Sequence, residues 1–382
     1  MNNTDEVWMA RAIQEAERGR GSVEPNPVVG AIVVKDGRIV GEGHHARFGG
    51  PHAEVVALKE AGLQARGASL YVTLEPCCHH GKTPPCTDAI LAAGVARVVV
   101  AVRDPFPSVD GGGLARLREA GLEVELGPLA DQAVALNAPF FKLVLTRLPY
   151  VIAKWAMTLD GKVAVANGDS RWISGEASRR LVHQLRGRMD AILVGIGTAI
   201  ADDPELTARP PGPRTALRIV VDTHARLPLE SKLVSTARSV PVLIAASERA
   251  PEDRCRALRE LGCEVLILPA ESSQVALVPL LEELGRRSLT NLLVEGGGSL
   301  LGSFFDAGQV DEVDIYLAPT IEGGDHARTP IRGRGLERMA DSTRLALRRC
   351  SRVDDDLRVQ AVLPRPWRSA LEELGLPRSD PT

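Results

Sequence analysis

The sequence predicts an α/β protein of two domains, and three observations support this prediction. The chain has 382 residues, whereas a single hydrophobic core rarely grows beyond about 250–300 residues. Short β-branched runs alternate with segments of helical spacing along most of the chain. At Thr146-Arg147-Leu148-Pro149 a helical stretch ends and a new β run begins. We therefore expect a first domain over residues 1–146, a second over residues 149–364 and a peripheral tail over residues 365–382.

The first half alternates strands with helices in the order of a three-layer α/β domain. Apolar residues between positions 5 and 19 follow a helical spacing that ends at Gly19. Asp36-Gly37 is the turn of a predicted hairpin. The predicted strands are 31–34, 39–43, 69–74 and 95–102, and the further helices are 52–62, 87–93, 114–120 and 137–145.

The second half repeats this alternation without an internal sequence repeat. Its predicted strands are 150–156, 191–194, 218–221, 240–245, 264–268, 291–294 and 314–318, with helices such as 176–188 and 299–307 between them. This pattern predicts a second α/β domain. In the tail we expect one short helix at 369–374.

Composition and charge exclude several classes of protein. The net charge is −3 and aromatic residues make up 3% of the chain, so no basic, aromatic-bearing surface for nucleic acid is indicated. The polar, acidic start lacks a signal-peptide pattern, and no apolar run approaches the ~18 residues that span a membrane. We expect a cytoplasmic enzyme that acts on a small molecule, binds neither nucleic acid nor membrane, and forms a homo-oligomer.

A metal site is predicted by a histidine, an acid and two cysteines. Three of the six cysteines lie between positions 77 and 86, a clustering that favours metal over disulfides. His52 and the pair Cys77 and Cys86 supply one imidazole and two thiolates, which leave a fourth tetrahedral position for water. Glu54 remains free to move protons. The pattern is typical of zinc deaminases, although their usual C-x-x-C is here C-x8-C.

Two alternatives remain for these residues. They could be ordinary buried cysteines with a core histidine, or they could hold a structural zinc whose fourth ligand is Cys78, His79 or His80. The acid at Glu54 argues against a closed structural site, which has no use for it.

In the second half, two glycine turns indicate a nucleotide. Gly195-Ile196-Gly197-Thr198 and Glu295-Gly296-Gly297-Gly298 each follow a predicted strand. Such turns let backbone N–H groups approach a phosphate, although a single glycine turn is structural about as often as functional. Two of them at strand ends of one α/β domain favour a nucleotide site there.

These motifs resemble the bifunctional deaminase/reductase family of riboflavin biosynthesis, commonly called RibD or RibG. In the first half the resemblance rests on Asn26-Pro27-Val28-Val29-Gly30, His52-Ala53-Glu54 and the stretch from Glu75 to Cys86. In the second half it rests on the stretches 154–161, 170–174, 201–207 and 294–298. It implies a cytidine-deaminase-like domain followed by a dihydrofolate-reductase-like domain that uses NADPH.

The resemblance also implies roles for individual residues. In the first domain it implies one zinc per chain on His52, Cys77 and Cys86, with Glu54 as proton donor. Asn26, His45, Lys82 and Asp104 would contact substrate. Family members often carry Asn at Phe106 and Ser at Cys78, so one polar substrate contact is absent here and one thiol is added.

In the second domain the resemblance implies a cofactor site and a substrate site. Residues implied to line NADPH are Ala156, Trp172, Thr198, Asp202, Thr223 and the turn Gly297, Gly298, Ser299, Leu300, Leu301, Gly302 and Ser303. Residues implied to hold substrate are Ser170, Arg186, Leu206, Arg209 and Glu295. Guanidinium groups suit a sugar phosphate, although either arginine alone would more often be a solvated surface charge. Lys154 and Glu295 are the candidates for polar roles near the reacting ribose.

The activity implied is deamination of 2,5-diamino-6-ribosylamino-4(3H)-pyrimidinone 5′-phosphate, followed by NADPH-dependent reduction of its ribosyl group to ribityl. Two other functions compete with it. One is a nucleic-acid-editing deaminase with an accessory domain, and the other is a nucleotide-sensing module with a structural zinc.

Overall fold

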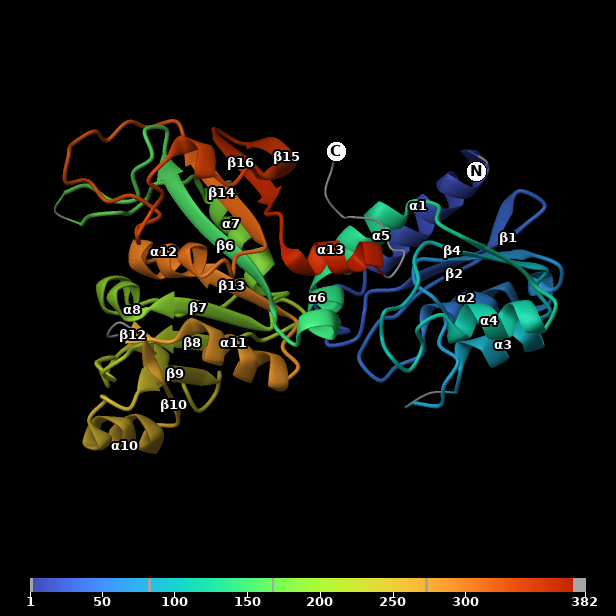
Figure 1. Ribbon diagram of the computed structural model, residues 1–382, viewed down its shortest axis with the longest axis horizontal. Coiled ribbons are helices and arrows are strands. Elements are labelled where there is room, and N and C mark those ends of the chain that lie inside the picture. Colours follow the sequence, from blue (N-terminus) through green and yellow to red (C-terminus); the bar gives the residue numbers. More distant parts are fainter. Residues whose placement is uncertain (1–2, 82–83, 167, 272–273, 374–382) are drawn as a thin grey trace. The chain divides into compact units, whose positions relative to one another are not determined.

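The chain divides into two compact units, each built on its own β-sheet (Figure 1). The computed structural model describes residues 3–81, 84–166, 168–271 and 274–373. The first unit runs to Arg147 and takes in the helix that begins at Pro366, and the second spans Leu148–Arg365. Within the described residues, no helix is both long enough and apolar enough to cross a membrane.

A five-stranded sheet in the order β2-β1-β3-β4-β5 forms the centre of the first unit. The antiparallel hairpin of β1 and β2 lies at one side, β1 also pairs antiparallel with β3, and β3, β4 and β5 are parallel. The strands are β1 (Gly30–Lys35), β2 (Arg38–His44), β3 (Ser69–Val72), β4 (Arg97–Val100) and β5 (Glu123–Leu126).

Helices cover both faces of this sheet and make three layers. The helices of the unit are α1 (Asn3–Glu17), α2 (Ala53–Ala61), α3 (Cys86–Ala93), α4 (Gly112–Glu119), α5 (Ala130–Leu136) and α6 (Ala138–Thr146), with a 3-10 turn at Gly62–Ala65. Two strand glycines allow close approach: a Cβ at Gly30 would lie 2.0 Å from the Ala12 carbonyl oxygen of α1, and one at Gly43 2.5 Å from the Ala53 carbonyl oxygen of α2. The core between the sheet and α2, α3 and α4 includes Val33. Because Gly30 and Val33 differ by an odd number of positions, α1 lies on the other face.

The C-terminal helix α13 (Pro366–Glu373) belongs to the first unit and packs on α6. Arg368 and Leu371 on this helix are almost fully buried. The described part of the predicted peripheral tail therefore forms part of the packed unit. The helix begins three residues earlier than the predicted 369–374.

A nine-stranded sheet in the order β10-β9-β8-β7-β13-β6-β14-β16-β15 forms the second unit. From β10 to β14 neighbouring strands are parallel, and β16 and β15 add an antiparallel hairpin at one edge. The strands are β6 (Tyr150–Thr158), β7 (Ala191–Gly195), β8 (Leu217–Val221), β9 (Val242–Ser247), β10 (Glu264–Leu268), β13 (Asn291–Glu295), β14 (Glu312–Ala318), β15 (Ala346–Val353) and β16 (Asp356–Val362).

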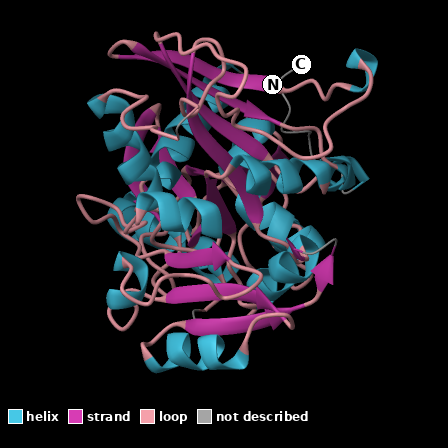
Figure 2. Cartoon of the chain, turned by 90° about the vertical axis from the view of Figure 1, so that its left-hand side faces the viewer, coloured by secondary structure: helices cyan, strands magenta, loops and turns pink. Residues whose placement is uncertain are grey.

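Helices flank the strands of this unit (Figure 2). They are α7 (Glu176–Arg186), α8 (Ile196–Asp202), α9 (Lys232–Ser235), α10 (Glu252–Glu260), α11 (Leu277–Arg286) and α12 (Gly298–Asp306). A short ladder of β11 (Ala270–Glu271) and β12 (Gln274–Val275) and a 3-10 turn at Met339–Asp341 complete the described elements. The main core lies between one sheet face, which includes Val151, Ala153 and Val294, and the apolar sides of α11 and α12. Leu284 and Phe304 from these helices are fully buried in it.

The alternation of strands and helices predicted for both halves is confirmed by these two α/β units. The sequence prediction missed the edge hairpin of β15 and β16. The strand β15 has no fully buried residue, and its three arginines break the apolar alternation on which strand prediction relies.

Candidate active sites

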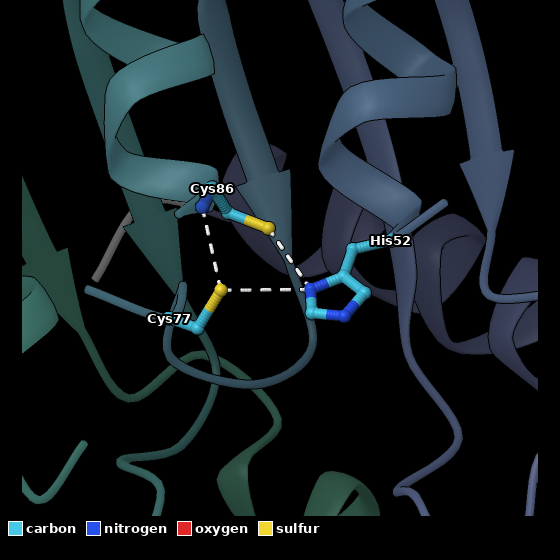
Figure 3. A group of neighbouring side chains, drawn as sticks. All are labelled: His52, Cys77 and Cys86. Carbon is cyan, nitrogen blue, oxygen red and sulfur yellow. Dashed lines mark hydrogen bonds between the residues drawn. The ribbon is translucent and has the colours of Figure 1, made fainter. Parts of the chain in front are cut away.

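In the first unit, His52, Cys77 and Cys86 come together, as Figure 3 shows. Their ligand atoms all lie within 4.8 Å of one another. The Nδ1 atom of His52 is 3.1 Å from Sγ of Cys86 and 3.6 Å from Sγ of Cys77. Cys86 is fully buried, and the other two are half-buried.

Two helix starts and a strand end position these three side chains. His52 immediately precedes α2, Cys86 is the first residue of α3, and Cys77 follows the end of β3. The backbone N–H of Cys86, free at the helix start, donates to Sγ of Cys77 at 3.3 Å. A thiolate at Cys77 is therefore stabilised by the first turn of α3.

The donor set fits a zinc ion. Hydrogen bonds from the Cys86 thiol and from His52 lower the pKa of the Cys77 thiol to about 4, whereas the bond that Cys86 donates raises its own pKa. One imidazole nitrogen and two sulfurs are ligands that zinc prefers. Among the described residues the group includes neither Cys78, His79 nor His80, so a tetrahedral ion here would keep an open fourth position.

Glu54 lies in the first turn of α2, two residues after His52. It is 3% exposed. Burial raises the pKa of its carboxyl above the usual range, and the nearby His52 opposes this effect only in part. A buried carboxyl with a raised pKa can both accept and return a proton near neutral pH.

Asn26 and His45, both predicted substrate contacts, form a pair beside the cluster. Nδ2 of Asn26 is 3.1 Å from Nε2 of His45, and Nδ1 of His45 is 3.0 Å from the carbonyl oxygen of Pro51. The rings of His45 and His52 are 5.3 Å apart, edge to face. Burial lowers the pKa of His45, which favours its neutral form.

Asp104 lies in the loop after β4, where Glu75 anchors it. Oε2 of Glu75 accepts the backbone N–H of Asp104 at 3.2 Å and that of Gly111 at 3.1 Å, and Oε1 accepts that of Leu114 at 3.0 Å. Burial raises the pKa of Asp104 to about 7. Sequence reasoning missed this role of Glu75, because the residues that it holds lie 29 to 39 positions further along the chain.

Two further predictions concern this site. Phe106 is partly exposed, and its backbone N–H donates to the Asp104 carboxylate at 2.8 Å. This hydrogen bond does not depend on which side chain stands at position 106. The predicted substrate contact Lys82 lies outside the described residues.

In the second unit, Lys154, Arg186 and Glu295 gather on β6, α7 and β13. Lys154 and Glu295 are partners in the register of two parallel strands. Nε and one terminal nitrogen of Arg186 donate to the two carboxylate oxygens of Glu295 at 2.7 and 2.6 Å. Burial opposes ionisation of Glu295, but Arg186 and Lys154 outweigh it and lower the pKa. Arg186, which was predicted to contact phosphate, therefore forms a bidentate ion pair with Glu295 in this structure.

The two predicted glycine turns meet at the carboxyl end of the sheet. A Cβ at Gly297 would lie 3.2 Å from the hydroxyl oxygen of Thr198, and one at Gly195 3.6 Å from Cβ of Leu300. Thr223 follows β8, the strand beside β7, and its carbonyl oxygen accepts the Ser247 N–H at 3.2 Å. Thr198, Thr223 and the Gly297 turn therefore follow three strands of one parallel sheet.

Within α12, the predicted cofactor residues divide into two kinds. Leu300 and Leu301 are buried in the core, so their side chains pack on the sheet. At Gly302 a Cβ would lie 1.9 Å from the Arg332 carbonyl oxygen, which explains the glycine by close chain packing. Gly298 is also closely packed, since a Cβ there would lie 2.8 Å from the Thr329 carbonyl oxygen, whereas Ser299 is exposed at the helix start and Ser303, one turn later, is half-buried.

The segment 202–209 contacts Arg186 through Thr207. The carbonyl oxygen of Thr207 accepts a hydrogen bond from the Arg186 guanidinium at 3.4 Å. Leu206 is buried, with a positive φ of 53°. Arg209 is exposed and pairs with Glu205. The backbone N–H of Arg209 also donates to Nδ1 of His183 at 3.3 Å.

The segment around Trp172 contacts this loop through Arg171. Arg171 donates to the backbone oxygen of Asp202 at 2.6 Å. The Trp172 ring is 72% exposed and stacks under Arg179 of α7 at 4.6 Å. Ser170 is half-buried, and Ala156 lies on β6 two residues beyond Lys154.

Both halves of the chain match known families. Residues 2–102 match the family described as the cytidine and deoxycytidylate deaminase zinc-binding region, and residues 149–359 match the RibD C-terminal domain. The riboflavin biosynthesis protein RibD of Actinobacillus pleuropneumoniae is 42% identical over 363 residues, 95% of this chain and 96% of that protein. These matches confirm the cytidine-deaminase-like and dihydrofolate-reductase-like folds expected for the two halves.

Solved structures agree over nearly the whole length. Acinetobacter baumannii RibD has 38% sequence identity and a TM-score of 0.82, covering 95% of this chain and 99% of that one. A Thermotoga maritima structure described as a diaminohydroxyphosphoribosylaminopyrimidine deaminase/5-amino-6-(5-phosphoribosylamino)uracil reductase has 35% identity and a TM-score of 0.82. It covers 94% of this chain and 99% of that one.

Proposed function

The chain belongs to the RibD family of riboflavin biosynthesis, the bifunctional deaminases and reductases, and we propose how its two units divide the chemistry. The first unit deaminates 2,5-diamino-6-ribosylamino-4(3H)-pyrimidinone 5′-phosphate. The second reduces the ribosyl group of the deaminated product to ribityl with NADPH. The product is 5-amino-6-ribitylamino-uracil 5′-phosphate.

The observation that carries the deaminase assignment is the cluster of His52, Cys77 and Cys86 with the buried Glu54 beside it. Zinc held there would supply Lewis acidity toward a water molecule at the open fourth position. Glu54 accepts a proton from the attacking water, passes it to a ring nitrogen and protonates the departing amino group. Water and the amino-pyrimidine thereby become the oxo-pyrimidine and ammonia.

Substrate recognition in the first unit falls to Asn26, His45 and Asp104, with Lys82 as a phosphate contact. The hydrogen-bonded pair of Asn26 and His45, whose ring lies against that of His52, supports this role. Because burial favours neutral His45 and its Nδ1–H donates to the Pro51 carbonyl oxygen, Nε2 is an acceptor, which a donor on the pyrimidine edge can take over from Asn26.

The reductase assignment rests on Lys154 and Glu295, brought together by strand register beside the glycine turns. NADPH bound along Ala156, Trp172, Thr198, Asp202, Thr223 and residues 297–303 would supply the hydride. Lys154 supplies the proton, so that the imine carbon of the opened sugar gains a hydride and its nitrogen gains a proton. Glu295 accepts a hydrogen bond from a ribose hydroxyl.

The substrate phosphate in the second unit is bound by Arg209, with Arg186 contributing its remaining N–H groups. Ser170 and Leu206 complete that side. Arg209 is exposed, and its pairing with the equally exposed Glu205 is weak enough to be exchanged for a phosphate.

Glu54→Gln tests the deaminase assignment, because the amide keeps the shape of the carboxyl but cannot carry the proton. We expect ammonia release to fall by about 10²–10⁴-fold while the chain keeps its zinc. NADPH consumption on the deaminated substrate should stay unchanged. Glu60→Gln, an exposed position on the same helix, serves as the control. Normal ammonia release from Glu54→Gln would refute the role of Glu54, and loss of both activities would refute the independence of the two sites.

Neither alternative function is favoured. An editing deaminase with an unrelated accessory domain does not account for relatives that cover 95% of this chain, including its second unit. A sensing module with structural zinc requires a closed ligand set, and the described residues supply three ligands.

A further inference from the structure

A row of five charged side chains crosses four adjacent strands of the second unit. In order they are Arg186 of α7, Glu295 of β13, Lys154 of β6, Asp314 of β14 and Arg358 of β16. The signs alternate along the row, with three cations and two anions. Only Lys154 and Glu295 were predicted to act on the ribose.

Strand register shows that the row lies on one sheet face. Lys154 is the register partner of Glu295 on one side and of Asp314 on the other. Successive residues of a strand point to opposite faces. Ala153 and Val294, the neighbours in sequence of Lys154 and Glu295, belong to the core on the other face.

The two ends of the row are closed ion pairs. Arg186 holds both carboxylate oxygens of Glu295 at 2.7 and 2.6 Å. Arg358 holds both oxygens of Asp314 in the same way, at 2.7 and 2.8 Å. Asp314 is 1% exposed, and Arg358 is partly buried.

The side chain of Lys154, at the centre, makes neither a hydrogen bond nor an ion pair with any described residue. Its Nζ lies over the ring of Tyr316, 5.7 Å from the ring centroid. The guanidinium carbon of Arg358 is 5.5 Å from the same centroid, and the Tyr316 hydroxyl donates to Asp314 at 3.4 Å. The Tyr316 ring therefore touches both cations.

The charge on Lys154 depends on all the groups around it. Burial lowers the pKa of Lys154, Glu295 and Asp314 oppose this effect, and Arg186 adds to it. His183 on α7 also affects the row, since its charge acts on Glu295. Tyr316 stays a neutral phenol, because burial and Asp314 raise its pKa.

We propose that Asp314 and Arg358 are positioning residues of the reductase reaction, which hold the Lys154 ammonium in place and poise it as proton donor. The proposal rests on the role given above to Lys154. Asp314, on the strand next to Lys154, stabilises the protonated form of Lys154. The positive charge of Arg358 weakens this stabilisation, and its two hydrogen bonds hold the Asp314 carboxylate in place. After each transfer to the substrate nitrogen, Lys154 takes a proton back from solvent.

The test is the pH dependence of the reductase kcat, measured by NADPH consumption on the deaminated substrate. Activity that needs protonated Lys154 falls as the pH rises through its pKa. Asp314→Asn removes a stabilising charge, so the midpoint of this alkaline limb should move down by about one pH unit. Arg358→Gln removes an opposing charge, so the midpoint should move up. The double variant should return near the wild-type midpoint.

Arg358→Lys is the matched control, because it keeps the charge and loses the bidentate geometry. It should keep the wild-type midpoint with a lower kcat. If Asp314→Asn does not fold, the two Arg358 variants still test the proposal. It then predicts that the midpoint of the alkaline limb moves up in Arg358→Gln and does not move in Arg358→Lys. The proposal is overturned if all variants share one midpoint or if both single variants shift in the same direction.

Lys154→Met separates this inference from the function on which it rests. If the alkaline limb survives in Lys154→Met, Lys154 is not the proton donor and the proposed reductase role fails. If that limb is lost there but does not move in the Asp314 and Arg358 variants, only the positioning role fails. Ammonia release by the first unit of each variant serves as a control for the amount of active enzyme in the preparation.

Discussion

Gly43 lies in β2 against the first turn of α2, the helix that carries Glu54 and follows His52. A Cβ at position 43 would lie 2.5 Å from the carbonyl oxygen of Ala53 and 2.6 Å from the amide nitrogen of Ala57. Both are backbone atoms, so Gly43→Ala must displace α2 by roughly 0.9 Å to restore an ordinary contact of 3.4 Å. A shift of about 1 Å can cost about 100-fold in rate, so we expect the kcat of deamination to fall by about that factor. Overpacking should also remove about 1–3 kcal/mol of stability.

Ammonia release measures the effect of Gly43→Ala, and NADPH consumption on the deaminated substrate is the internal reference. The reductase rate should not change, because that site lies in the other unit. Gly197→Ala makes the same substitution where a Cβ meets no atom within 4 Å, and it should leave ammonia release unchanged. If Gly43→Ala deaminates at close to the wild-type rate, the close packing of α2 does not position Glu54, and the reasoning is refuted.

Three further predictions concern single groups. Removing the metal with a chelator should abolish ammonia release but spare NADPH consumption on the deaminated substrate; loss of both would contradict separate sites. Burial raises the pKa of Asp104 to about 7, so the folded state binds an extra proton and wild-type stability falls as the pH rises between about 4 and 7. Asp104→Asn should flatten this slope in thermal unfolding, and equal slopes would count against it. Asp190→Ala should cost about 3–5 kcal/mol in urea unfolding, because Asp190 accepts N–H bonds from Thr290 and Asn291 and pairs with Arg214; a loss below about 1 kcal/mol would be inconsistent.

The candidate metal cluster could be predicted from the sequence because its residues lie close together in the chain. Cys77 and Cys86 lie nine residues apart around one strand end and one helix start, and His52 begins the helix that also carries Glu54. Residue type and spacing together restrict what such a set can bind. The glycine turns were recognisable for a similar reason, because each follows its strand directly in the chain.

Partners far apart in the chain could not be predicted in this way. Asn137 bonds both the N–H and the carbonyl oxygen of Val28, at 2.8 and 2.9 Å, and so ties the Asn26 loop to α6. Neither residue type nor spacing indicates this contact. Likewise Glu75 was visible as part of a motif, but its hold on the Asp104 loop depends on how β3 and β4 pair.

By itself, then, the sequence determined the kind of chemistry: two α/β units, a metal-binding donor set with an acid beside it, and glycine turns suited to a phosphate. Only the tertiary structure decided which charges share a surface. Strand order and register, which depend on contacts between distant segments, place Lys154 between Glu295 and Asp314, and the packing of α7 pairs Arg186 with Glu295. Alternation along a strand predicts which of its residues lie on the same face of the sheet. Which charged side chains lie next to them depends on the strands that pair with it.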